Sequence, residues 1–591
     1  MTFRPERLFA SLLLGAAALA APLAAAPGDA ALAEAEAALA REDGVAAELA
    51  GKRALEEGAA RADVAALVGE GELLQGDLAD ARSWLGDAAF SDATRTRGLS
   101  ALARLQMAEG DYAAAIATYD LMVSEGRESA ALWVDIGRMR YRLGLHHQAL
   151  EAARRAVELD GSDPRALEFE AQLVRDAEGV VPSLALFRRA LEAAPTDKAL
   201  MQQYAATLGD AGEYRRMLHA VRALVKEHGN DPFAFYLQAV MAARAGQDDL
   251  AQRLWWRTEG QFDGNAAGLI VNGVLEYRSG NPAVAVELFD SLRRMQPMSD
   301  AALLLYARAL VANDEANAAL AVLEPHAQRP DASPYMLVLA ARAHEQLGNR
   351  ARAGDYLDRA SFAAAQPGRA MPAFLPRDSA GRMADPDNPL LQLREMLNEG
   401  DLPAARAMVE RLNAQYAGSA DLQMLAGDVH LLAGSRASAM AYYRAAAQIR
   451  RDWPLVQRMV ALQDSAPAQA REVLANYLAG NPRQQAAAAL LGRMHRDAGN
   501  PARATALLRH AASLGAGGRD ALLLADLAQM EAALGNGEAA LSRANEAHRL
   551  WRGNRNVARV FGRIREMQGD TGAGTGALLA KAQGTGLSPA P

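Results

Sequence analysis

The stretch WVDIGRMRYRLGLHHQALEAARRAVELDGSDP, residues 133–164, contains the pattern that decides the fold. Gly144 lies near its middle, with the small residue Gly137 seven positions before it and Ala149 five positions after it. A glycine at such a point ends one helix in a left-handed cap and allows the next helix to begin. The stretch therefore predicts a unit of two helices joined by a tight turn.

This glycine belongs to a column that recurs every 34 residues. Seven of nine successive positions at that spacing are glycine, and Glu178 (beside Gly179) and Asp314 occupy the other two. Glycine makes up 49 of 591 residues, so fewer than one would fall in nine positions by chance. A fixed period of this length indicates a chain built from structural repeats. The glycines of the column are Gly76, Gly110, Gly144, Gly212, Gly246, Gly280 and Gly348.

Three further columns keep the same period. The first, seven residues before the turn, is always small, and the second, five residues after it, is small except at Met217. The third, nine residues after it, is mostly bulky: Leu85, Tyr119, Ala153, Phe187, Val221, Trp255, Phe289, Leu323 and Leu357. We expect the small residues where two antiparallel helices approach most closely and the bulky ones in the space beside them. A single hairpin cannot bury its apolar face alone, so the units must stack.

With these columns the chain resembles the tetratricopeptide repeat family, whose unit is a 34-residue helix-turn-helix. The fullest match is formed by Trp133, Ile136, Gly137, Gly144, Ala149, Ala156 and Pro164. The pattern resumes later with Gly400, Gly434, Gly499, Gly535 and Gly569, and Leu393 weakens its opening unit. The resemblance implies an all-α fold, a right-handed α-α superhelix (solenoid) of about 14 to 16 hairpins in two halves, with a concave groove.

The chain divides into five expected segments. Residues 1–26 have the basic start, apolar Leu8 to Leu19 and small residues of a signal peptide, with an uncleaved anchor helix as the alternative. Residues 27–361 form an N-terminal repeat array, 362–388 a linker rich in Pro and Gly, 389–583 a C-terminal array, and 584–591 a flexible tail. No other stretch is apolar enough to span a membrane. An exported chain without cysteine indicates the periplasm of a bacterium.

Composition excludes several kinds of chemistry. The absence of cysteine removes disulfides, thiolate nucleophiles and cysteine zinc sites. Only four residues are lysine, which removes most candidates for a Schiff base. The net charge of −8 gives no reason to expect nucleic acid as a partner.

No catalytic, metal or cofactor site is expected from the motifs. His344-Glu345 begins like the helix of a zinc protease, but Gly348 stands where the second ligand is needed. His430 and His495 share the repeat position of His344, which favours packing over metal binding. The adjacent pair of His146 and His147 is expected at the surface, because neighbouring side chains diverge on a helix.

The first helices of stacked hairpins line the concave face, where ligands of such arrays lie. The position after the small column is Arg in seven of fourteen units, and the candidates for the groove are Arg104, Arg138, Arg308, Arg342 and Arg394. Guanidinium groups bind carboxylates bidentately. The alternative is that these arginines pair with acids of neighbouring units. The aromatic candidates on the same face are Phe233, Tyr236, Tyr277 and Tyr335, and whether they belong to the groove or the core stays open.

The resulting prediction is a non-catalytic periplasmic scaffold or adaptor that binds a protein or peptide in its groove. A narrower form, by analogy of fold alone, is a role in cell-envelope assembly or polysaccharide export. Two alternatives remain: a lytic hydrolase of cell-wall glycan, which would need a compact module outside the repeats, and a self-assembling structural array. The sequence leaves the partner and the oligomeric state open.

Overall fold

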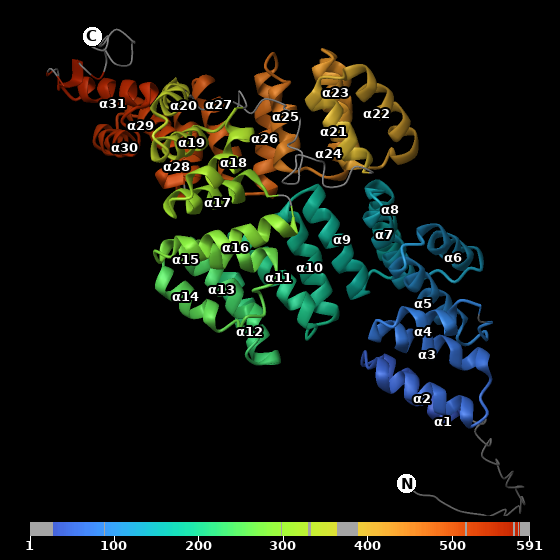
Figure 1. The fold of residues 1–591 in the computed structure, drawn as a ribbon. Coiled ribbons are helices and arrows are strands. Elements are labelled where there is room, and N and C mark those ends of the chain that lie inside the picture. The colour runs from blue at the N-terminus through green and yellow to red at the C-terminus, as the bar shows by residue number, and fades with distance from the viewer. Residues whose placement is uncertain are drawn as a thin grey trace, which may run out of the picture. The chain divides into compact units, whose positions relative to one another are not determined.

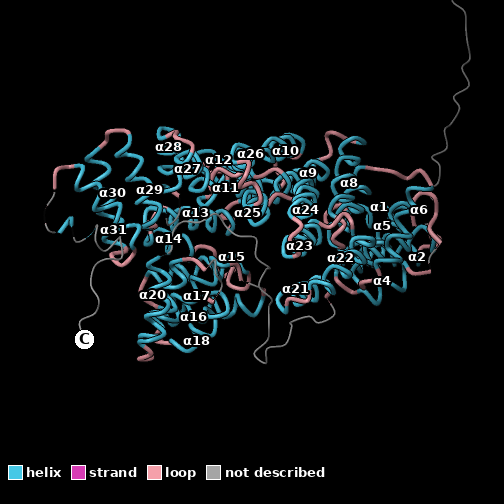
Figure 2. Tube along the Cα trace, turned by 90° about the horizontal axis from the view of Figure 1, so that it is seen from above, coloured by secondary structure: helices cyan, strands magenta, loops and turns pink. Residues whose placement is uncertain are grey.

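The computed structural model of the chain describes residues 28–87, 89–296, 298–328, 332–362, 388–514 and 517–570, with 572, 574–576 and 578. These residues form thirty-one α-helices and one short 3-10 helix, and they contain no strand (Figure 1 and Figure 2). The predicted all-α class is therefore confirmed for the described part of the chain.

The first helices are α1 (Asp29–Leu39), α2 (Gly44–Glu56), α3 (Arg61–Gln75), α4 (Leu78–Leu85), α5 (Arg95–Ala108), α6 (Tyr112–Ser124), α7 (Ala130–Arg142), α8 (His146–Leu159), α9 (Pro164–Ala177), α10 (Val180–Ala193), α11 (Lys198–Asp210), α12 (Tyr214–His228), α13 (Pro232–Arg244), α14 (Asp248–Trp256), α15 (Ala266–Arg278), α16 (Pro282–Met295), α17 (Asp300–Ala312), α18 (Ala316–Ala327), α19 (Pro334–Gln346) and α20 (Arg350–Phe362). The later helices are α21 (Pro389–Glu399), α22 (Leu402–Tyr416), α23 (Ala420–Leu432), α24 (Arg436–Ile449), α25 (Trp453–Ala461), α26 (Pro467–Gly480), α27 (Gln485–Asp497), α28 (Pro501–Ser513), α29 (Ala521–Ala533), α30 (Gly537–Leu550) and α31 (Arg555–Met567), with the 3-10 helix η1 (Gly517–Arg519) before α29.

Consecutive helices form hairpins, from α1 with α2 to α29 with α30, and the second helix of most hairpins also contacts the first helix of the next. In the hairpin of α7 and α8, Gly137 lies close to Ala152. The described helices make fifteen such pairs followed by α31, within the predicted range. All seven glycines of the turn column have a left-handed backbone, with φ between 72° and 87°. At the position where glycine is missing, Asp314 takes φ 60°, a conformation that short polar side chains tolerate better than most.

The small and bulky columns pack against each other within one hairpin, as predicted. A Cβ added to Gly273 would lie 2.8 Å from the ring of Phe289, and one added to Gly492 would lie 2.9 Å from Leu508. The small residues of the second helices, such as Ala285, are fully buried. Leu357 is the exception in the bulky column, because its side chain is 39% exposed and not buried.

Tyr356, the residue before Leu357, is only 6% exposed and fills the core in its place. Only the bulky position is displaced by one residue in this hairpin, because the turn residue Gly348 and the small residue Ala353, which is 2% exposed, keep their places in the repeat. Tyr356 stacks on the ring of His344, with centroids 5.6 Å apart, so this packing accounts for the change.

The chain divides into two compact units, residues 1–132 and 133–591, with the boundary inside α7. The predicted linker, residues 362–388, lies almost wholly outside the described residues, as do the predicted signal peptide and the tail. Residues 133–361 of the predicted N-terminal array belong to the second unit together with the predicted C-terminal array. Within the described ranges, every helix falls short of the length and apolarity needed to cross a bilayer.

Inside the second unit the chain folds back on itself. Helices α8 and α9 contact α24, α10 contacts α26, and α20 contacts α31 (Figure 1). Helices that belong to the two predicted arrays are thus packed side by side. We call the contact between α7–α12 and α22–α27 the seam.

Candidate functional site

The predicted groove arginines fall into two groups with different surroundings. In the first unit, the Nη2 atom of Arg104 lies 2.7 Å from Oε1 of Glu70, exactly one repeat earlier in the same column. In the second unit, Arg138 on α7 lies 3.9 Å from Glu168 on α9. The alternative reading, in which arginines pair with acids of neighbouring hairpins, describes these two residues.

Arg394 on α21 lies in a partly buried, charged environment. Burial lowers the pKa of its guanidinium, and Arg458 lowers it further, whereas Asp421 and Asp428 act in the opposite direction. Its buried Nε atom has no hydrogen-bond acceptor among the described residues. Arg394 therefore remains a candidate groove residue, and its Nε–H group donates no hydrogen bond to a described residue.

The second group of arginines lies with two predicted tyrosines on the successive first helices α15, α17 and α19. The guanidinium of Arg308 covers the ring of Tyr277 at 4.5 Å, and its Nε atom donates a 2.9 Å hydrogen bond to the tyrosine hydroxyl oxygen. Burial raises the pKa of Tyr335, and the positive charges of Arg308 and Arg342 oppose this increase. We call these four residues, Tyr277, Arg308, Tyr335 and Arg342, the ledge.

The ledge is accessible and lacks carboxylates of its own. Tyr335 is 44% exposed and Arg342 is exposed. Within the described part of the chain, no acidic side chain forms an ion pair with Arg308 or Arg342. This distinguishes both from Arg104, which shares the carboxylate of Glu70 with Arg97.

The other two predicted aromatic residues form a half-buried cluster. Tyr236 on α13 stacks on Phe262 with centroids 4.8 Å apart, and Phe233 lies 6.1 Å from the same ring. Burial raises the pKa of the Tyr236 hydroxyl. Phe262 was missed because it lies in the turns between α14 and α15, where the repeat pattern assigns no position. The cluster is therefore part core and part surface.

A buried ionic group in the second unit was also missed. Arg458 on α25 binds both oxygens of Asp428 on α23, at 2.7 and 2.9 Å, and the Tyr443 hydroxyl donates to the same carboxylate at 2.6 Å. Burial raises the pKa of Tyr443 well above its usual range, and the Asp428 charge adds to this. A signal existed in the sequence, because Asp428 occupies the column that elsewhere holds arginine.

His344, His430 and His495 lie in packed surroundings, as their shared repeat position predicts, whereas His146 contradicts the separate prediction of a surface pair. His344 stacks on Tyr356, His430 stacks on Tyr442 at 5.0 Å, and burial lowers the pKa of His430 and His495. The prediction of a surface pair was wrong for His146, which is 9% exposed, because the seam covers it. Its neighbour His147 is exposed as predicted.

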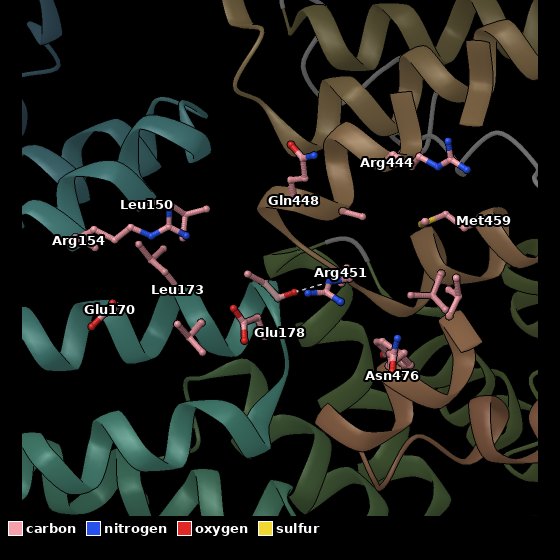
Figure 3. Close-up of a pocket in the computed structure, with 17 residues that line it drawn as sticks. Leu150, Arg154, Glu170, Leu173, Glu178, Arg444, Gln448, Arg451, Met459 and Asn476 are labelled. Carbon is pink, nitrogen blue, oxygen red and sulfur yellow. Dashed lines mark hydrogen bonds between the residues drawn. The ribbon is translucent and has the colours of Figure 1, made fainter. Parts of the chain in front are cut away.

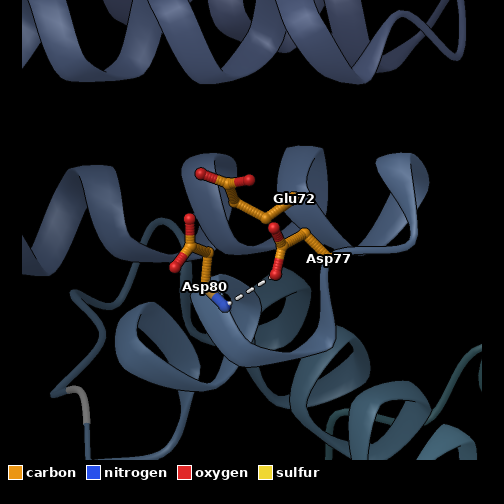
Figure 4. Close-up of side chains that lie close together, drawn as sticks. All are labelled: Glu72, Asp77 and Asp80. Carbon is orange, nitrogen blue, oxygen red and sulfur yellow. Dashed lines mark hydrogen bonds between the residues drawn. The ribbon is translucent and has the colours of Figure 1, made fainter.

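One group of three carboxylates lies close together in the described part of the first unit (Figure 4). The oxygens of Glu72, Asp77 and Asp80 lie within 4.8 Å of one another. Asp77 caps α4 by accepting a 3.1 Å hydrogen bond from the amide of Asp80, and Lys52 lies 3.2 Å from Glu72. Helix capping and this ion pair explain the positions of Asp77 and Glu72.

A cavity of about 430 Å³ lies at the seam (Figure 3). Leu173 of α9 and Met459 of α25 line opposite sides, while Arg154 and Arg444 come from α8 and α24. Arg451 also lines it, and its Nε atom donates a 3.0 Å hydrogen bond to the carbonyl oxygen of Ala177. Apolar and charged side chains share the walls, and the charges are of both signs, since Glu170 and Glu178 also line the space.

No family model matches the chain, and no curated protein matches its sequence. Several solved structures are similar to it. A crystal structure of the APC/C heterotetramer Cut9-Hcn1 has a TM-score of 0.36 and 12% identity over 94% of this chain and 96% of that chain.

The human IFIT1 dimer with m7Gppp-AAAA has a TM-score of 0.36 and 14% identity over 66% and 90% of the two chains. A tetratricopeptide repeat protein from Parabacteroides merdae has a TM-score of 0.28 and 14% identity over 39% and 91%. At these scores, function has to be argued from the chain's own residues.

Proposed function

We propose that the protein is a non-catalytic repeat scaffold of the tetratricopeptide type that binds a protein or peptide partner on the ledge. The observation that supports this proposal is which arginines of the repeat column form an ion pair with an acidic side chain. Arg308 and Arg342 have no acidic partner among the described residues, whereas Arg104 in the same repeat column is paired at 2.7 Å. A guanidinium without a carboxylate partner is free to bind one from another molecule.

The geometry of Arg308 supports a binding role. Its Nε atom is used by the Tyr277 hydroxyl, and its plane is held against the tyrosine ring, so the side chain is ordered before any partner arrives. Side chains that are fixed beforehand lose less conformational entropy on binding. The two Nη atoms of Arg308 donate no hydrogen bond to a described residue, so they can donate to a ligand.

The proposed partner is an extended peptide segment that carries a carboxylate and an apolar or aromatic side chain. The carboxylate, from Asp, Glu or a chain end, would bind Arg308 and Arg342. The apolar side chain would pack on the exposed ring of Tyr335. Tyrosine and arginine are the side chains that most often dominate protein interfaces, which fits this composition.

The test starts from a random peptide library displayed on phage and selected on the purified full-length protein. Selected peptides are then synthesised with a fluorophore, and their affinities are measured by anisotropy for the wild type and for Arg308→Gln/Arg342→Gln. We expect enrichment of acidic peptides and a loss of at least about tenfold in affinity, equivalent to about 1.4 kcal/mol. Raising the salt concentration should weaken binding further, because the contact is ionic.

The matched control is Arg215→Gln/Arg222→Gln, which removes two charges from exposed positions of α12. This variant should bind like the wild type. If both double variants lose affinity equally, the effect comes from net charge and the ledge is not the site. If selected peptides bind the ledge variant unchanged, the proposal is wrong.

We also propose that the protein is exported to a bacterial periplasm, on the basis of Arg4, Arg7 and the apolar residues that follow. A role in envelope assembly or polysaccharide export is the narrower form and rests on analogy of fold. Fractionation of the native host and N-terminal sequencing of the mature protein test the location. Recovery of the intact N-terminus in the cytoplasm would contradict it.

The catalytic alternative is tested separately. Purified protein is incubated with cell-wall glycan, and soluble fragments are measured by mass spectrometry. We expect no release above that of a boiled sample, and release that persists through purification would replace the scaffold by the hydrolase.

A further inference from the structure

His146 lies at one end of the seam, where α8 begins and α23 begins beside it. The backbone amide of Ala420 donates a 3.2 Å hydrogen bond to Nδ1 of His146, 274 residues earlier. In the same place, the amide of His147 donates a 3.2 Å hydrogen bond to the carbonyl oxygen of Gly418. These bonds join two helices that are distant in sequence.

The direction of the first hydrogen bond fixes the protonation state of His146 at Nδ1. A backbone N–H can only donate, so Nδ1 must accept and carries no proton. Ala420 is the first residue of α23, and the capping side chain of Ser419 binds Leu422, so it leaves the Ala420 amide to His146. Ala420 is 3% exposed, and a buried amide without an acceptor costs free energy.

We propose that His146 is an acid-sensitive latch of the seam: its neutral ring holds α8 against the amino end of α23, and protonation releases this contact.

Protonation would change the contact in two ways. A proton on Nδ1 would replace the acceptor by a second donor facing the Ala420 amide. The positive imidazolium would also lie at the amino end of α23, where the helix dipole disfavours positive charge. Both effects act against the closed arrangement.

The charged and titratable groups around His146 come from four elements. Tyr141 on α7 meets its ring edge to face, with centroids 5.0 Å apart. Burial lowers the pKa of His146, and Arg450 after α24 lowers it further, while Asp421 on α23 and Asp176 on α9 oppose this. Burial therefore outweighs the two carboxylates.

This direction sets the pH window. The pKa of His146 is lowered in the closed state. Its full contribution to the stability of the closed seam is therefore present above the ordinary histidine pKa of about 6.5. This contribution to stability is lost as the pH falls through the lowered pKa of His146. The contact should therefore hold at neutral pH and weaken in mild acid.

The absence of cysteine in the chain allows a direct distance measurement. Arg142 at the end of α7 and Gln415 near the end of α22 are both exposed, and each is changed to Cys and labelled with a nitroxide. Double electron–electron resonance then gives the distance across the seam in the full chain. We expect one distribution at about pH 7.5 and an added longer population at about pH 5.5.

Three further variants, each in the labelled background, identify the group responsible. His146→Asn keeps an acceptor near the Nδ1 position but does not titrate, so it should stay closed at both pH values. His147→Asn is the matched control, because this exposed neighbour should leave the acid response intact. His146→Phe removes the acceptor and should show the longer population at both pH values.

Two results would overturn the proposal. One is a wild-type distribution that does not change between the two pH values. The other is a His146→Asn variant that opens in acid like the wild type, which would assign the response to another group. Since His146→Asn introduces no bulk, it keeps the test valid even if His146→Phe fails to fold.

Discussion

The Nε atom of Arg451 donates a 3.0 Å hydrogen bond to the carbonyl oxygen of Ala177, which lies 274 residues earlier in the chain. The bond between Ala420 and His146 spans the same 274 residues. Both bonds therefore keep the same offset along the chain, so the segments that begin at His146 and Ala420 lie side by side as far as Ala177 and Arg451.

Close backbone packing at the seam makes Gly480 sensitive to substitution. A Cβ at this residue would overlap the carbonyl oxygen of Glu178, and the α carbon of Gly179 lies 3.5 Å from the same position. We expect Gly480→Ala to lower the free energy of unfolding by about 1 to 3 kcal/mol, measured by urea unfolding followed with circular dichroism. Gly354→Ala is the control, since α20 leaves open space there, and it should gain about 0.5 to 1 kcal/mol. Equal effects of the two changes would contradict the close packing.

The small column predicts a cost for added volume between the helices of one hairpin. Ala285 on α16 is fully buried, and we expect Ala285→Leu to destabilise the protein by about 1 to 3 kcal/mol through overpacking. Ala283→Leu adds the same atoms at an exposed position of the same helix and should change stability by less than about 0.5 kcal/mol. Thermal unfolding of the two variants makes the comparison. If Ala285→Leu leaves the stability unchanged, the two helices of this hairpin are packed less closely than described.

The buried pair of Asp428 and Arg458 should respond asymmetrically to mutation. Asp428→Asn leaves a buried guanidinium without its counter-charge and should cost about 3 to 5 kcal/mol. The double change Asp428→Leu/Arg458→Met removes both charges and should recover most of this loss. Glu70→Gln, whose partners Arg97 and Arg104 are both 40% exposed, should cost less than about 1 kcal/mol. Urea unfolding of all four proteins tests this order, and a double variant as unstable as Asp428→Asn would contradict it.

Asp231 should contribute to stability in a pH-dependent way. Burial raises its pKa, but Lys198 at 2.9 Å and the amides of Phe233 and Ala234 overcome this, so the pKa lies below its usual range. The contribution is therefore present above the unfolded value of about 3.9 and is lost as the pH falls through the folded value. Asp231→Asn should lower stability at neutral pH and reduce the slope of stability against pH in acid. An unchanged slope would assign the acid sensitivity to other carboxylates.

The sequence predicted the hairpins because their determinants are local. A turn glycine such as Gly144 and a small residue such as Ala149 act within one unit, and both behave as predicted. Where the residue type changed, as at Asp314, the backbone kept the left-handed turn. The shift from Leu357 to Tyr356 escaped prediction because it depends on the ring of His344 in the neighbouring helix.

The candidate site could be predicted only in part. The repeat placed Arg104, Arg308 and Arg342 in one column, but a column does not give the distance between side chains. In the structure, Glu70, one repeat before Arg104, forms an ion pair with it, whereas Val274 stands at the equivalent place before Arg308. Sequence reasoning therefore gave the positions, and side-chain pairing separated the ledge from the structural ion pairs.

The amino-acid sequence by itself determined the all-α class, the hairpin unit and its turns, because a 34-residue period specifies what each unit packs against next. Only the tertiary structure decided the seam, and with it the burial of His146 and the contact of Arg451 with Ala177. The physical reason is that small rotations between neighbouring hairpins accumulate along a stack. No local pattern encodes the sum of these rotations over the many hairpins that separate the two segments of the seam.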